Sequence, residues 1–215
     1  MAFTPYRRLP GVCPLALLNL FRTRRHVLPA EAARFLQSQA AYVAQKTVLD
    51  YCRVKAGRSE KQLFSDPDFQ AALAHCRWQV FFAALADVTA LIEAHLRPHA
   101  PGQEAALMQG LIILHQTALL AETPPEEEAA SAVEARDALP HYLATLQLAP
   151  PHPAERLPLL AEPVLFATLP VHPEQRRGES LAIKGALRFQ MVTTQQELER
   201  RFDAAKTVDN ILNQR

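Results

Sequence analysis

Residues 66–97, DPDFQAALAHCRWQVFFAALADVTALIEAHLR, carry the clearest helical pattern of this chain. They contain no glycine, and their one proline, Pro67, follows Asp66, a residue type that caps helix N-termini. Their apolar side chains form two helical stripes that together cover about two thirds of the circumference. A helix of about 30 residues is about 45 Å long. A helix this apolar packs on more than one side, so we predict that it is central.

Two other long stretches, residues 30–56 and 186–215, also lack both proline and glycine. Nothing in them interrupts the hydrogen-bond ladder of an α-helix. They predict a first helix over 29–55 and a last helix that begins near 179–181 and runs beyond Phe202. A short strand at 187–193 is the alternative within the last helix, because that sequence is locally β-prone.

A third predicted helix, over residues 103–122, is more apolar still, with no charge between residues 105 and 121. Its length lies at the lower limit for crossing a bilayer, and polar residues interrupt it. We therefore expect a buried helix of a bundle. A fourth helix is expected to begin with the acids Glu126–Glu128, which suit a helix N-terminus, and to stop or kink at Pro140. The alternative is that residues 141–148 continue it.

Residues 140–173 hold eight of the seventeen prolines and predict a connector with one short helix near 159–169. The chain as a whole is predicted to be all-α. We expect a bundle of five to seven helices with two long central helices and this proline-rich connector. Residues 1–28 form a basic N-terminal segment, expected to dock, and residues 29–215 form a single helical domain.

The composition excludes several classes of site. None of the six glycines lies close to another, so the chain has neither a dinucleotide-binding fingerprint nor a phosphate-binding loop. No metalloprotease, nucleophile-elbow or di-iron motif is present, and we predict no metal and no cofactor. The three cysteines are widely spaced, which argues against a disulfide framework and indicates a cytoplasmic protein.

Charge is distributed unevenly along the chain, although the net charge is only +1. Residues 1–28 contain five arginines and no acid, whereas residues 59–170 carry an excess of nine acids. The basic segment 1–28 and the acidic segment 59–170 can attract each other within the fold or within a dimer. The alternative is an anionic partner that binds the basic cluster Arg22, Arg24, Arg25 and His26. The cluster lacks interleaved aromatic residues, so nucleic acid is an unlikely partner.

The apolar run over residues 11–21 precedes this cluster. Eleven residues cannot span a bilayer, and no signal-peptide cleavage site follows them. We expect a short helix that docks on the bundle. Peripheral contact with a membrane surface is the alternative.

Two polar residues interrupt apolar helical faces and are the candidate catalytic residues. Asp87 lies within a stripe of the central helix, and His115 lies in the middle of the uncharged third helix. If these two helices are antiparallel, the residues lie at similar heights. A buried pair that fixes the register of the helices is the structural interpretation, and an acid–base pair is the catalytic one.

The missing catalytic motifs and the uneven charge favour a non-enzymatic protein-interaction, regulatory or assembly module. Such a module would bind a protein partner, or a second copy of itself, through the basic segment or an exposed helical face. The alternative function is an enzyme or carrier for a small apolar ligand bound within the bundle, beside Asp87 and His115.

Overall fold

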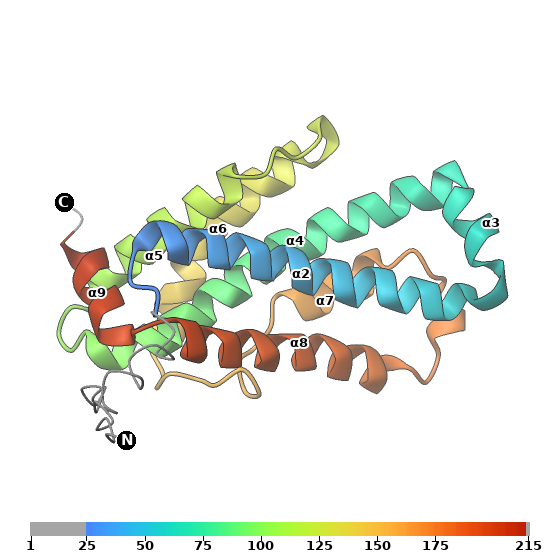
Figure 1. The fold of residues 1–215 in the computed structure, drawn as a ribbon. Helices are drawn as coiled ribbons and strands as arrows, with labels where there is room; N and C mark the ends of the chain where they lie inside the picture. The colour runs from blue at the N-terminus through green and yellow to red at the C-terminus, as the bar shows by residue number, and fades with distance from the viewer. Residues whose placement is uncertain (1–24, 214–215) are drawn as a thin grey trace, which may run out of the picture.

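A computed structural model describes residues 25–213 (Figure 1). Within this range the chain forms seven α-helices of at least eight residues, one shorter α-helix and four short 3-10 helices, and no β-strand. The prediction of an all-α bundle is therefore confirmed. The α-helices are α2 (Pro29–Ala56), α3 (Glu60–Ser65), α4 (Pro67–Leu96), α5 (Glu104–Leu120), α6 (Ala129–Gln147), α7 (Ala161–Thr168), α8 (Ser180–Arg201) and α9 (Ala204–Leu212).

The two long helices α2 and α4 form the centre of the bundle and run antiparallel, joined by α3 (Figure 1). The Asp66 side chain caps α4 by accepting a hydrogen bond from the Phe69 N–H at 2.9 Å. The segment Pro67–His99 is long and apolar enough to cross a membrane, but 78% of its most apolar window is buried inside the bundle. Its apolar composition therefore matches a core helix, with neighbours on several sides.

The C-terminal helix is not continuous, which corrects the prediction. Helix α8 covers residues 187–193, so the strand alternative is wrong, but it ends at Arg201. Phe202 takes an extended conformation and its backbone pairs with His26, and α9 then starts under the cap of Asp203. The pairing fixes residues 25–28 on the bundle, through His26 N–H to Arg201 O at 2.7 Å and Asp203 N–H to His26 O at 3.2 Å.

Helix α6 passes through Pro140 and continues to Gln147, which agrees with the alternative that residues 141–148 continue the helix. The proline-rich connector therefore begins after Gln147 and not at residue 140. The short helix expected near 159–169 is α7, so that prediction is confirmed. The connector is packed against the bundle: Ala154, Leu157 and Leu159 are buried.

Candidate functional site

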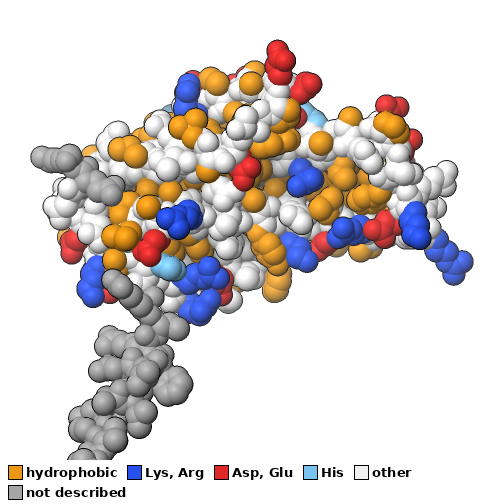
Figure 2. Space-filling view, turned by 45° about the horizontal axis from the view of Figure 1, so that its top comes forward, with side chains coloured by type: hydrophobic (Ala, Val, Ile, Leu, Met, Phe, Trp, Pro, Cys, Tyr) orange, Lys and Arg blue, Asp and Glu red, His pale blue; other side chains and the backbone are white. Residues whose placement is uncertain are grey.

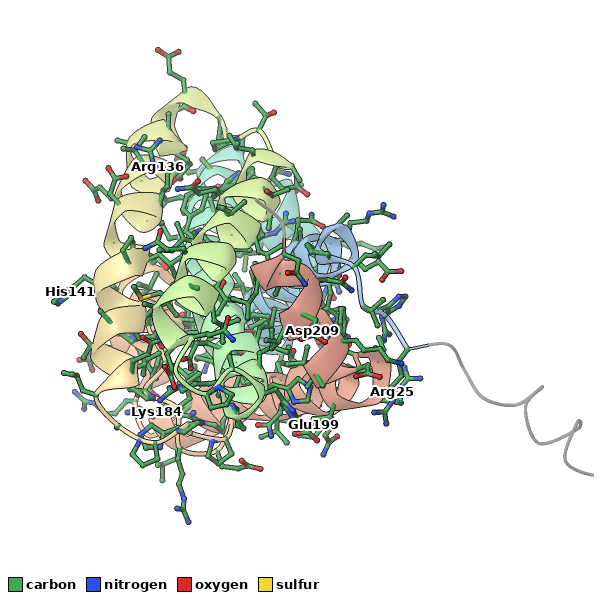
Figure 3. The ribbon with its side chains drawn as sticks, turned by 90° about the vertical axis from the view of Figure 1, so that its left-hand side faces the viewer. Arg25, Arg136, His141, Lys184, Glu199 and Asp209 are labelled. Atoms are coloured by element: carbon green, nitrogen blue, oxygen red, sulfur yellow. The ribbon has the colours of Figure 1, made fainter. Side chains whose placement is uncertain are left out.

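Helix α5 lies at the surface of the bundle, between α6 and α9, although the sequence predicted a buried helix (Figure 3). One side of α5 packs inward through Leu107, Leu111 and Ala118. The other side is exposed and uncharged; we call it the outer face of α5, and it consists of Ala106, Gln109, Ile113, Thr117 and Leu120.

Apolar side chains of this face are open to solvent. Ile113 is 59% exposed and Leu120 is 83% exposed, and Val133 on the neighbouring α6 is 46% exposed. In the view of Figure 2, hydrophobic side chains reach the surface in separate patches with charged groups between them. Apolar surface that is open to solvent is where protein partners bind when it is contiguous, so the outer face of α5 is the candidate interaction surface.

Two shallow grooves border the outer face of α5. The groove between α5 and α9 has a volume of about 290 Å³, and the groove between α5 and α6 has a volume of about 460 Å³. No charged side chain lines the first groove among the described residues, whereas the second includes Glu122, Arg136 and Asp137. The first groove is lined by Pro29, Gln103, Ala106, Gln109, Gly110, Ile113, Leu114, Ile211 and Leu212.

Gly110 lets α9 approach α5 closely. A Cβ atom at this position would overlap the Cγ2 atom of Ile211 on α9. Ile211 is buried there, and the groove with α9 forms along this contact.

The first candidate catalytic residue, Asp87, binds the start of α7. Its carboxylate accepts hydrogen bonds from the N–H groups of Leu160 and Ala161, at 2.8 and 2.9 Å, and from the Tyr142 hydroxyl at 3.3 Å. Asp87 therefore caps a helix distant in sequence. Desolvation in the core raises the pKa of Asp87 to about 7, although its hydrogen bonds oppose this shift.

The second candidate, His115, does not bond to Asp87. The ring is fully buried, and neither ring nitrogen has a hydrogen-bond partner among the described residues. Desolvation lowers the pKa of His115 to about 4, so the ring is neutral at pH 7. The two residues are both buried, as the sequence indicated, but they do not form an acid–base pair in the described part of the chain.

The basic cluster is only partly described. Arg22 and Arg24 lie outside the described residues, while Arg25 and His26 are exposed. The His26 Nδ1 atom lies 3.0 Å from Glu31 Oε1, and the ring lies 5.3 Å from the ring of Phe202. His26 thus contacts the start of α2 and the junction of α8 with α9.

Sequence reasoning missed several polar contacts that join distant segments. Glu93 is buried and binds Arg97, whose guanidinium also donates to the carbonyl of Ala149 at 2.6 Å. The Arg188 guanidinium donates to the carbonyls of Ala154 and Leu157. The i,i+4 spacing of Glu93 and Arg97 is a signal from which their ion pair could have been predicted, but no sequence pattern indicates the bonds to the connector carbonyls.

The acid run at the predicted fourth helix has a second role that the sequence did not indicate. Glu128 is buried, with His75 Nδ1 at 2.6 Å and a hydrogen bond from Gln79 Nε2 at 2.7 Å. This contact joins the segment before α6 to α4.

The described residues contain no group of three or more histidine, cysteine, aspartate or glutamate side chains placed to hold a metal ion. No family model, no curated protein and no solved structure matches this chain. A function for this chain is therefore inferred from its sequence and structure.

Proposed function

We propose that this chain is a non-enzymatic protein-interaction module that binds a helix of a partner protein on the outer face of α5. The observation that carries the proposal is the outer face itself. It is an exposed and uncharged helical face, bordered by two grooves. A partner helix with an uncharged side can place its apolar residues beside Ile113 and Leu120, as in other helix-in-groove complexes.

The alternative, an enzyme or carrier with a ligand inside the bundle, has less support. Both carboxylate oxygens of Asp87 are engaged by the protein itself. Neither Asp87 nor His115 lines the grooves beside α5.

A cytoplasmic location belongs to the same proposal. Cys52 and Cys76 are buried free thiols. Free cysteines are typical of a reducing compartment.

The test replaces Ile113 and Leu120 by glutamate in the full-length chain. A charge on the outer face must lose its water when a partner binds, so we expect partner binding to weaken at least about tenfold. The matched control is Leu181→Glu, because Leu181 is 84% exposed and lies on α8. Circular dichroism checks that all variants keep the helical content of the parent.

The first measurement identifies the proteins in a lysate that bind to the parent chain and to the control but not to the α5 variant. The second measures the affinity of one of these proteins, after purification, for all three chains. The proposal is wrong if each retained protein binds the α5 variant and the parent equally well. Sedimentation of the purified chain separates binding of another protein from self-association through the same face.

A further inference from the structure

The N-terminal sequence contains a segment that matches the groove between α5 and α9. Residues 11–21, GVCPLALLNLF, carry no charge and lie outside the described residues. The groove is likewise lined by uncharged side chains, among them Ala106, Ile113 and Leu212. An uncharged segment loses little hydration energy when it enters an uncharged groove.

The chain enters the bundle next to this groove. The carbonyl of Val27 accepts a hydrogen bond from Asn210 Nδ2 of α9 at 3.1 Å, and Pro29 lines the groove itself. Because residues 25–28 are fixed on the bundle, only residues 22–24 connect Arg25 to Phe21, and an extended chain over these four steps reaches up to about 14 Å. Pro29, which lines the groove, is itself only four residues from Arg25, so this part of the groove lies within the same reach.

Charge supports the same placement. Arginines flank the segment on both sides, at Arg7, Arg8, Arg22 and Arg24. Two acidic residues are close in sequence to residues that line the groove: Glu104 follows Gln103 at the start of α5, and the exposed Asp209 precedes Ile211 by two positions on α9. Figure 3 shows Asp209 on α9. The segment can thus place its apolar part in the groove and its arginines near these carboxylates.

We infer that residues 11–21 bind in the groove between α5 and α9 of their own chain and cover part of the outer face of α5. The segment then competes with a partner for this face, and in this respect the inference rests on the proposed function. The binding of the segment itself needs no partner and can be measured on the purified chain.

The first experiment uses Cys13, which lies inside the segment. Ile113→Cys places a second thiol in the groove, and Leu181→Cys places one on α8 as the control. Burial raises the pKa of Cys52 to about 12 and that of Cys76 to about 11, so these thiols stay protonated and react slowly. A short bis-maleimide should join Cys13 to position 113 within one chain at least about tenfold faster than to position 181, because docking raises the local thiol concentration.

The second experiment tests the apolar contact in the full-length chain. With Cys13→Ser and Ile113→Cys in place, we compare alkylation of position 113 with and without Leu17→Glu and Leu20→Glu. The two glutamates should release the segment and raise the alkylation rate at least about tenfold. The same two substitutions with Leu181→Cys as the reporter should leave its rate unchanged.

Equal cross-linking rates at positions 113 and 181 would overturn the inference, as would an alkylation rate that the glutamates do not change. Cross-links between two chains would also overturn it and would assign the groove to a second copy. Flotation of the parent chain with anionic lipid vesicles, together with missing cross-links, would assign residues 11–21 to a membrane surface. These experiments need no partner helix. Their outcome can therefore contradict the binding of residues 11–21 in the groove without contradicting the proposed binding of a partner, and the reverse also holds.

Discussion

At the scale of single residues, Asp87 and His115 show two ways in which a core accommodates a polar group. Asp87 receives three hydrogen bonds and joins α4 to α7. His115 receives none from the described residues. The carboxylate of Asp87 and the ring of His115 both lose water on burial, but only Asp87 gains hydrogen bonds from the protein in return. We therefore expect removal of the Asp87 side chain to destabilise the fold and removal of the His115 ring to stabilise it.

Replacing His115 by leucine should raise the free energy of unfolding by about 1–3 kcal/mol at pH 7, because it removes two unpartnered buried nitrogens. The folded-state pKa of His115 is about 4, below the ordinary value of 6.5. The unfolded chain therefore binds more protons between pH 6.5 and 4, and the parent loses stability as the pH falls through this range. The advantage of His115→Leu should grow in the same range.

Urea unfolding at pH 7 and pH 5 measures both effects. The half-exposed Gln116, next in sequence, gives the control Gln116→Leu, which should change the free energy of unfolding little at either pH. A loss of stability in His115→Leu would show that the ring has a polar partner, such as a buried water molecule.

Asp87 has the opposite pH dependence. Its folded-state pKa of about 7 lies above the ordinary value of 3.8, so the folded chain binds more protons between these values. Stability due to this residue is fully present below pH 4 and is lost as the pH rises to about 7, by on the order of 4 kcal/mol at most. Asp87→Asn should remove this loss, and Asp87→Ala should cost about 2–4 kcal/mol at pH 5 because the N–H groups at α7 lose their cap.

The measurement is the free energy of unfolding of parent, Asp87→Asn and Asp87→Ala chains at pH 4, 5.5 and 7. Parallel curves for parent and Asp87→Asn would mean that Asp87 stays ionised throughout, held by its hydrogen bonds and by the nearby Arg188.

At the scale of elements, α5 is the helix for which position matters most. Its sequence is almost uniformly apolar, yet one side faces the core and the other faces solvent. Helix α9 covers part of it at Gly110 and leaves the groove beside the contact. The contact between α5 and α9 therefore sets the shape of the candidate docking site.

Gly110→Ala tests this contact. Alanine favours the helix by about 1 kcal/mol over glycine, but its Cβ overlaps Ile211 and should push α9 away. We expect amide hydrogen exchange in α9 to become roughly tenfold faster, while exchange in α8 stays unchanged. Gly185→Ala on α8 is the matched control, since a Cβ there meets no other atom within 4 Å. Unchanged exchange in α9 would show that the two helices accommodate a methyl group.

At the scale of the whole molecule, single polar side chains hold the proline-rich connector on the bundle. Asp87 from α4 binds the start of α7, and Arg188 from α8 binds two connector carbonyls. Gln195 on α8 accepts a hydrogen bond from the Ala154 N–H at 2.6 Å. Proline offers no N–H, so connector carbonyls without a helix to pair with need such outside donors.

Arg188→Ala should therefore loosen the connector. Arg156, which lies between the two carbonyls that Arg188 binds, is exposed and is a trypsin site. We expect cleavage after Arg156 to become roughly tenfold faster in Arg188→Ala, because local opening exposes the backbone. Arg200→Ala, on the same helix but paired with Glu197, is the control and should leave that rate unchanged. Equal rates in all three chains would show that apolar packing alone holds the connector.

Much of the fold could be predicted from local sequence features. Asp66 and Pro67 marked the start of α4, and the absence of proline and glycine marked α2 and most of α8. Pro140 left two alternatives, a helix that stops or kinks there and one that continues over 141–148, and the helix continues to Gln147. The end of α8 was missed, since it depends on the pairing of Phe202 with His26, far away in sequence.

The candidate site was less predictable. The sequence shows the uncharged run over residues 105–121, but this run does not distinguish a helix that is buried on all sides from one at the surface of the bundle. Which side of α5 stays open depends on where α6 and α9 lie. Asp87 and His115 were correctly expected to be buried, but their partners depend on the path of the connector.

Local sequence features were enough to predict an all-α bundle around a long apolar helix, because helix formation and capping depend on residues a few positions apart. The tertiary structure alone decided that Asp87 caps α7, that His115 has no partner among the described residues, and that α5 presents an uncharged face to solvent. These features arise from contacts between segments tens of residues apart. Packing sets such contacts, and no local pattern in the chain records them.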